Sequence, residues 1–193
     1  MGAAQSPPAT QKDFDIMKYT NGTKGKTWYD IFHSPVCYEP LGAHDITAFY
    51  RVIENAALVE GSPQVELVNT MIYHGHKKWI GGVAIANPQY ADAEDGRGES
   101  KLLVKFNSSP FVLAFTPIAD YWVLGVAPDY RYAIVSTPAR NVLWILSETP
   151  HLSKEDQVVI REWLIDSQGF TEAQMDALIE TAHAPQGKTK PQL

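Results

Sequence analysis

The stretch Ile46-Thr47-Ala48-Phe49-Tyr50-Arg51-Val52 decides the fold class, because its side chains alternate between two faces of an extended strand. Ile46, Ala48 and Tyr50 share one face, as a half-buried strand requires. Turn residues separate this run from other short runs rich in β-branched and aromatic residues. The runs are Thr27–His33, Asp45–Val52, Val65–His74, Trp79–Ala86, Ser100–Phe106, Tyr121–Ala127, Tyr132–Ser136 and Asn141–Ser147. Short strands without intervening helices predict an all-β sandwich or an up-and-down barrel.

The pattern becomes helical after the last of these runs. Ser153 is a favourable N-cap, and Lys154–Ser167 carries one apolar stripe. Gly169 suits the end of this helix, and a capping box at Thr171 predicts a second short helix that ends before Pro185. A run of strands followed by one amphipathic helix fits an eight-stranded antiparallel barrel with the helix packed outside. Such a barrel has an interior that side chains fill or that holds one small ligand.

The chain has the length and composition of one globular domain, with 193 residues and 45% hydrophobic residues. We expect a disordered leader over residues 1–12, a barrel with its helices over 13–184 and a tail over 185–193. The net charge of −6 disfavours nucleic acid as a partner. A single cysteine, Cys37, excludes an internal disulfide. The polar N-terminal residues do not have the pattern of a signal peptide, and the sequons at Asn21 and Asn107 leave the compartment open.

Three segments resemble a known family when taken in order. Phe14–Tyr19 followed by Lys26–Ile31 resembles the opening signature of lipocalins, in which a Trp-Tyr pair begins the first strand. Tyr121–Val135 and Leu143–Pro150 resemble the later motifs of that family. Across about residues 13–170, the chain resembles bacterial outer-membrane lipocalins, apolipoprotein D and plant temperature-induced lipocalins. The resemblance implies an eight-stranded up-and-down barrel with an outer C-terminal helix.

The chain departs from the family pattern at the closed end of the predicted barrel. The family places an arginine at the end of the last strand, where it covers the first-strand tryptophan, here Trp28. Glu148 occupies that position in this sequence. We expect another cation, Lys12 or Arg161, to cover the Trp28 ring.

The family register also implies which residues face the interior. These candidate ligand-binding residues are Phe32, Ile46, Ala48, Tyr50, Leu67, Asn69, Met71, Ala84, Val104, Phe106, Tyr121, Val123 and Trp144. Such an apolar and aromatic lining with a few polar atoms is typical of a small-molecule pocket. Periodicity alone would assign the same residues to a filled core.

The resemblance implies binding and transport of a small hydrophobic ligand: a fatty acid, lysolipid, retinoid or pigment. For a carboxylate-bearing ligand, we expect Lys77, Lys78 or Arg51 near the mouth. Two alternatives share the fold: a lipocalin-type enzyme, such as an isomerase or pigment-modifying protein, and a filled-barrel interaction module. We predict no enzymatic activity, no cofactor and either a monomer or a homodimer.

The connection between the fifth and sixth runs is strongly apolar. Its residues Phe111, Val112, Leu113 and Phe115 are candidates for contact with a membrane, and the alternatives are a cover over the barrel mouth or a dimer contact. With the family resemblance, this loop favours a secreted, periplasmic or membrane-associated protein over a cytoplasmic one.

Two further features contain residue types that can bind a metal or act as a nucleophile, but the surrounding sequence favours neither role. His74 and His76 have a spacing compatible with a metal but no third ligand beside them, so we predict no metal site. Cys37 has no neighbouring Lys or Arg to activate it, and an inert thiol or an intermolecular disulfide is expected rather than a nucleophile.

Overall fold

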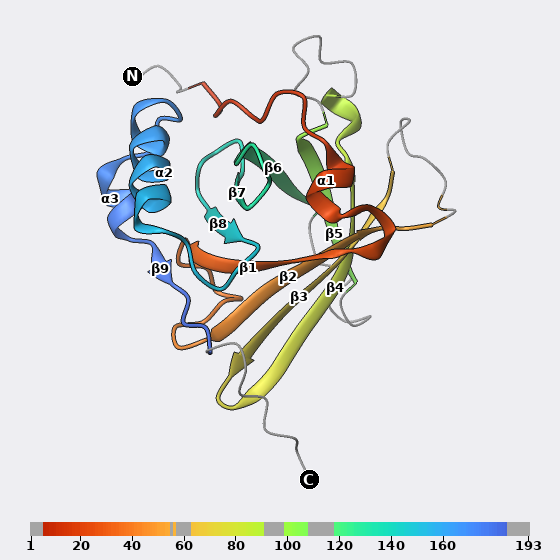
Figure 1. Ribbon diagram of the computed structural model, residues 1–193, viewed down its shortest axis with the longest axis horizontal. Coiled ribbons are helices and arrows are strands. Elements are labelled where there is room, and N and C mark those ends of the chain that lie inside the picture. The colour runs from red at the N-terminus through yellow and green to blue at the C-terminus, as the bar shows by residue number, and fades with distance from the viewer. Residues whose placement is uncertain (1–5, 55, 57–62, 91–98, 108–117, 185–193) are drawn as a thin grey trace.

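A computed structural model describes residues 6–54, 56, 63–90, 99–107 and 118–184. Strands dominate these residues (Figure 1). They are β1 (Lys26–His33), β2 (His44–Val52), β3 (Val65–Tyr73), β4 (His76–Ala86), β5 (Lys101–Asn107), β6 (Ala119–Val126), β7 (Tyr132–Ser136), β8 (Leu143–Ser147) and the two-residue β9 (Ile179–Glu180). The helices are α1 (Ile16–Thr20), α2 (Lys154–Asp166) and α3 (Glu172–Asp176), with short 3₁₀ turns at Gly22–Lys24 and Pro88–Tyr90.

The strands form a closed antiparallel barrel. Each strand from β2 to β8 pairs with the next, and β1 pairs with both β8 and β2, which closes the circle. The first half of β1 pairs with β2, while its last residues, Phe32 and His33, pair with β9. The prediction of an eight-stranded up-and-down barrel is therefore confirmed, and β9 is an additional short partner for β1.

The helix α2 packs on the outer wall of the barrel. The Ser153 hydroxyl accepts a hydrogen bond from the backbone N–H of Asp156, as expected of the N-cap. Ile160 and Leu164 are buried against an outer apolar cluster that also contains residues of β6, β7 and β8. Figure 1 shows α2 and α3 together on one side of the barrel, beside β8 and β9. No helix in the described residues is long and apolar enough to cross a membrane.

A second apolar cluster lies inside the barrel. Its fully buried members include Trp28, Val123 and Val135, each with no exposed surface. Tyr19 stacks on Trp28 with ring centroids 5.1 Å apart, and the Trp28 Nε1–H donates to the Tyr19 carbonyl oxygen. This packing fills the end of the barrel at which β1 begins, which we call the closed end.

The cation that covers Trp28 is Lys26, two residues before it on β1. The Lys26 Nζ lies 4.1 Å from the centroid of the Trp28 ring. It also lies 3.0 Å from the carboxylate of Glu148 and donates to the Tyr130 carbonyl oxygen. The expectation of a covering cation holds, but the choice of Lys12 or Arg161 was wrong. Arg161 instead pairs with Glu172 and Asp176, both far along the chain on α3.

A β-bulge in β1 changes the direction of its side chains. The register of β1 against β8 pairs Asp30 with Leu146 but Phe32 with Ile145, so one residue of β1 is extra. Beyond the bulge, His33 pairs with Trp144. Cross-strand partners share a face of the sheet, so Asp30 and His33 both face the interior although they are three residues apart.

Candidate functional site

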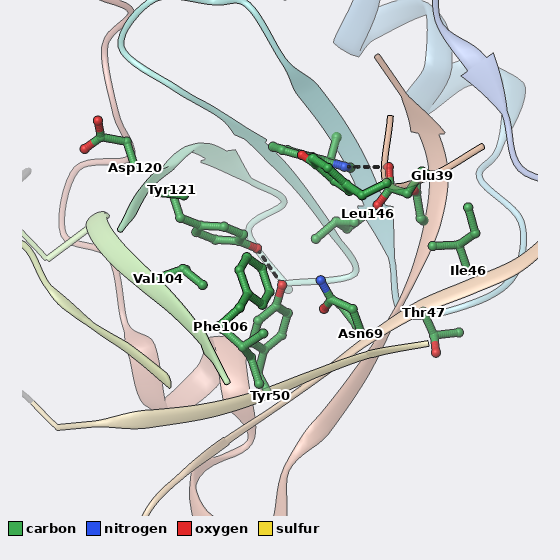
Figure 2. A pocket seen from close by; sticks show the side chains of 16 residues that line it. Glu39, Ile46, Thr47, Tyr50, Asn69, Val104, Phe106, Asp120, Tyr121 and Leu146 are labelled. Atoms are coloured by element: carbon green, nitrogen blue, oxygen red, sulfur yellow. Dashed lines mark hydrogen bonds between the residues drawn. The ribbon is translucent and has the colours of Figure 1, made fainter. Parts of the chain in front are cut away.

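A cavity of about 90 Å³ lies in the interior, toward the end of the barrel opposite Trp28. This end, which we call the open end, carries the connections from β1 to β2 and from β3 to β4. The lining comes from most of the strands and from the β1–β2 connection (Figure 2). The lining residues are Asp30, Tyr38, Glu39, Ile46, Thr47, Ala48, Tyr50, Leu67, Asn69, Val104, Phe106, Ala119, Asp120, Tyr121, Trp144 and Leu146.

Most of the predicted interior residues lie on the wall of this cavity. They are Ile46, Ala48, Tyr50, Leu67, Asn69, Val104, Phe106, Tyr121 and Trp144. Ala84 and Val123 are buried in the interior apolar cluster but are not on the cavity wall. Met71 lies further along β3 toward the open end and is half-buried.

Phe32 is the predicted residue whose placement was wrong. It packs with the outer cluster beneath α2 and α3, not with the interior. The prediction continued the alternation of Trp28 and Asp30 along β1, whereas the bulge shifts the alternation by one residue. His33 consequently occupies the interior position that Phe32 was expected to have.

Three tyrosine hydroxyl groups meet on one side of the cavity. The hydroxyl of Tyr121 lies 2.6 Å from that of Tyr19 and 3.1 Å from that of Tyr50. Figure 2 shows the rings of Tyr50 and Tyr121 meeting through their hydroxyl groups. Burial raises the pKa of all three phenols above the ordinary value, so they remain neutral hydrogen-bonding groups.

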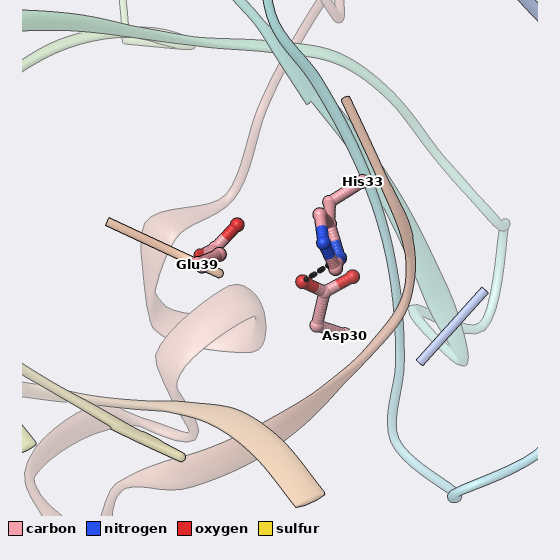
Figure 3. A group of neighbouring side chains, drawn as sticks. All are labelled: Asp30, His33 and Glu39. Atoms are coloured by element: carbon pink, nitrogen blue, oxygen red, sulfur yellow. Dashed lines mark ion pairs between the residues drawn. The ribbon is translucent and has the colours of Figure 1, made fainter. Parts of the chain in front are cut away.

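Asp30, His33 and Glu39 form a buried cluster, of which Asp30 and Glu39 line the cavity (Figure 3). The exposed fractions of these residues are 3%, 2% and 8%. The Asp30 carboxylate lies 3.1 Å from the Nδ1 of His33. Glu39 belongs to the β1–β2 connection, and its carboxylate accepts a hydrogen bond from the Trp144 Nε1–H. We call these three residues the acidic cluster.

Burial dominates the electrostatics of the acidic cluster. It raises the pKa of the Asp30 carboxyl, although the hydrogen bond and charge of His33 oppose the change. Burial, reinforced by the charge of Asp30, raises the pKa of Glu39 to about 7. Burial lowers the pKa of His33, but its interactions with Asp30 and Glu39 outweigh this effect, so its pKa is raised. Of the three residues, Glu39 therefore titrates near neutral pH.

The acidic cluster is also the place in the described residues where a metal ion could be held. One potential ligand atom from each of its three residues lies within 4.8 Å of the other two. Sequence reasoning considered His74 and His76 instead, but both are exposed at the β3–β4 turn. The acidic cluster was missed because the β1 bulge and the β1–β2 connection bring its residues together, and neither feature has a signal in the spacing.

The remaining predicted residues lie away from the cavity. Arg51 is near the closed end of β2 and pairs with Glu66 on the barrel surface, so its predicted place at the mouth was wrong. Lys77 and Lys78 are exposed at the open-end part of β4. The Cys37 thiol is exposed in the β1–β2 connection. Phe111, Val112, Leu113 and Phe115 lie outside the described residues.

The closed barrel, its outer helix and its internal cavity define the class: a single-domain antiparallel β-barrel that encloses a mostly apolar space. A family model described as a lipocalin-like domain matches residues 14–180. The chain therefore belongs to the lipocalin family, whose members bind small hydrophobic ligands.

Comparison with individual proteins agrees with this assignment. The chain is 27% identical to temperature-induced lipocalin-1 of Arabidopsis thaliana, over 94% of this chain and 91% of that protein. It is 26% identical to the outer membrane lipoprotein Blc of Citrobacter freundii, over 74% of this chain and 67% of that protein. The solved structure of insecticyanin from the tobacco hornworm Manduca sexta matches with a TM-score of 0.66 at 18% identity, over 95% of this chain and 87% of that one. At that identity, the structural likeness concerns the fold alone.

Proposed function

We propose that this lipocalin is a carrier that binds a small hydrophobic molecule inside its barrel and performs no chemistry on it. The observation that carries the proposal is the interior cavity, with apolar and aromatic side chains on most of its wall. Ala48 and Ala119 contribute little bulk to that wall, which helps to keep the space open. A filled-barrel module would instead close the same space with larger side chains.

The cavity holds only a small volume in this conformation. One water molecule needs roughly 10–15 Å³ by this measure, so about 90 Å³ accommodates several water molecules. Binding of a larger ligand such as a fatty acid, lysolipid, retinoid or pigment requires side chains on the wall to move outward.

Uptake of a neutral apolar fluorophore tests the proposal directly. N-phenyl-1-naphthylamine should gain fluorescence with the purified protein, and Ala48→Phe should reduce that gain at least about fivefold by filling the cavity. Ala173→Phe is a matched control because Ala173 is exposed on α3. Circular dichroism confirms that both variants fold. Unchanged uptake in Ala48→Phe would refute binding at this cavity.

Native mass spectrometry of the protein as purified, with extraction of any bound molecule, identifies the ligand class. A hydrophobic molecule bound at a ratio near one to one supports the carrier. An empty barrel that also excludes the fluorophore favours the filled-barrel module. A bound molecule that is converted with time favours the enzyme, and conversion abolished by Cys37→Ala would identify the nucleophile.

We further propose that the open end contacts a membrane or another lipid surface outside the cytoplasm. Large apolar side chains are exposed in the open-end half of the barrel: Tyr38, Leu41, Trp79 and Ile118. β5 ends and β6 begins at this end, and the sequence between them, residues 108–117, contains no charged residue. An apolar rim around the mouth would let a hydrophobic ligand pass between the lipid surface and the cavity.

A further inference from the structure

The polar atoms that are left without a hydrogen bond on the cavity wall are all acceptors. One carboxylate oxygen of Asp30 interacts with the Nδ1 of His33 at 3.1 Å, and the other is buried without a hydrogen-bond donor. The amide oxygen of Asn69 is likewise buried without a donor. Both residues line the cavity. A buried acceptor without a donor is costly, so this wall is complementary to a ligand that brings donors.

The charged residues on the cavity wall also favour a ligand that brings hydrogen-bond donors over an anionic one. Asp30, Glu39 and Asp120 line the cavity, whereas none of its described lining residues is Lys or Arg. An anionic ligand group would therefore approach two buried carboxyl groups in a medium of low dielectric. Lys77 and Lys78, in the open-end part of β4, are exposed and are not part of the lining.

The geometry of the acidic cluster suits one small donor group. The ligand atoms of Asp30 and Glu39 lie within 4.8 Å of each other. An ammonium nitrogen has three N–H donors and makes hydrogen bonds of about 2.7–3.0 Å, so it can reach both carboxyl groups at once, whereas a hydroxyl with its one O–H donates to one of them. A primary ammonium also brings a positive charge to the two carboxyl groups.

We propose that the ligand of this barrel is an amphiphile whose polar end is a primary amine or amino alcohol, held between Asp30 and Glu39, and not a carboxylate. The inference rests on the proposed carrier function and specifies the chemistry of its ligand. The apolar chain lies along Leu67, Val104 and Phe106, while the donor group lies at the acidic cluster. We therefore expect fatty acids to bind more weakly than amines and alcohols of equal chain length.

Displacement of N-phenyl-1-naphthylamine by octylamine, octanol and octanoate at neutral pH, with EDTA to remove divalent metals, tests this order. Octylamine should displace the fluorophore at a concentration at least about tenfold below octanoate, because one charge-assisted hydrogen bond contributes roughly that factor. Octanol should fall between them. Octanoate that displaces as well as octylamine would overturn the inference.

Variants of the lining residues test whether the preference for octylamine arises at the acidic cluster. Glu39→Gln should reduce the advantage of octylamine about fivefold or more and leave octanol nearly unchanged. Asp120→Asn removes an acidic lining residue that lies outside the acidic cluster and should preserve the advantage. Equal losses in both variants would indicate a general charge effect and refute the specific site. A preference for octanoate that disappears in Lys78→Gln would assign the polar end to the rim instead.

The same assay separates the two proposals. If the fluorophore itself does not bind, the carrier function fails. If it binds and the three octyl compounds displace it equally, the carrier function stands and only the assignment of the polar end fails.

Discussion

Glu39 is a cavity-lining residue whose pKa is raised well above its ordinary value. It is nearly buried, it receives a hydrogen bond from Trp144, and its pKa is raised to about 7 by burial and by the charge of Asp30. In the unfolded chain the carboxyl group titrates near 4.3. The folded protein therefore binds this proton more tightly than the unfolded chain does.

The sign of the pH effect follows from that difference. The contribution of Glu39 to stability is fully present below the unfolded pKa and is lost as the pH rises through about 7. We expect the urea midpoint to fall between about pH 4.5 and 7.5, and Glu39→Gln to flatten this part of the profile. A wild-type profile that rises through this window, or a variant profile that matches the wild type, would contradict the assignment.

Lys26 is the second residue with a defined energetic role. Its ammonium group lies over the Trp28 ring and is largely shielded from solvent by Glu148 and Tyr130. Lys26→Met should lower the free energy of unfolding by about 1–2 kcal/mol, as measured by urea denaturation. The control is Lys18→Met, because the Lys18 ammonium is exposed and 6.0 Å from the nearest ring. A loss of the same size in both variants would remove the special role of Lys26.

At the scale of elements, the bulge in β1 determines which side chains meet. Before it, Trp28 and Asp30 face the interior; after it, His33 does, while Phe32 supports the outer helices. Because of the extra residue, Ile31 and Phe32 both pack with the outer apolar cluster, and Asp30 and His33 on either side of them both face the interior. The β1–β2 connection then adds Glu39 from the open end.

The helix α2 is attached to the barrel through one buried stripe. Ile160 is 2% exposed, whereas its neighbour Val159 is 57% exposed. Ile160→Ala should lower the free energy of unfolding by about 2–5 kcal/mol, because it leaves a hole between the helix and the barrel wall. Val159→Ala should change it by less than about 0.5 kcal/mol. Similar losses in the two variants, measured by urea denaturation, would be inconsistent with this packing.

At the scale of the whole molecule, the two ends of the barrel differ in character. The closed end is filled by Trp28, Tyr19 and the covering Lys26. The open end carries the cavity and the exposed apolar side chains of Tyr38, Leu41, Trp79 and Ile118. This asymmetry fits a protein that exchanges its ligand through one end only.

Binding to lipid vesicles tests the role of the open end. The double variant Phe111→Ser/Phe115→Ser should reduce co-sedimentation with neutral phosphatidylcholine vesicles by at least about half, since it removes apolar surface that inserts into the lipid. Val158→Ser/Val159→Ser removes two exposed apolar side chains from α2 and should have little effect. Full vesicle binding by the first variant would eliminate the membrane contact and leave the mouth cover or a dimer contact.

The sequence by itself determined the features that depend on local order. The alternation in Ile46–Val52 predicted the strand and its interior face, and Ser153 and Thr171 predicted where the helices begin, because caps and alternation act within a few residues. The motif around Trp28 predicted the barrel and its closed end. Most of the interior residues that the family register implied lie on the cavity wall.

Only the tertiary structure decided which charged groups meet. Asp30, His33 and Glu39 approach one another through a bulge and a connection, and neither changes the residue types along the chain. Lys26 covers Trp28 because Glu148 and the Tyr130 carbonyl hold its ammonium group across the barrel end. Whether the barrel interior is filled or hollow depends on the combined packing of side chains from every strand. The spacing of residues along the chain does not give this combined packing.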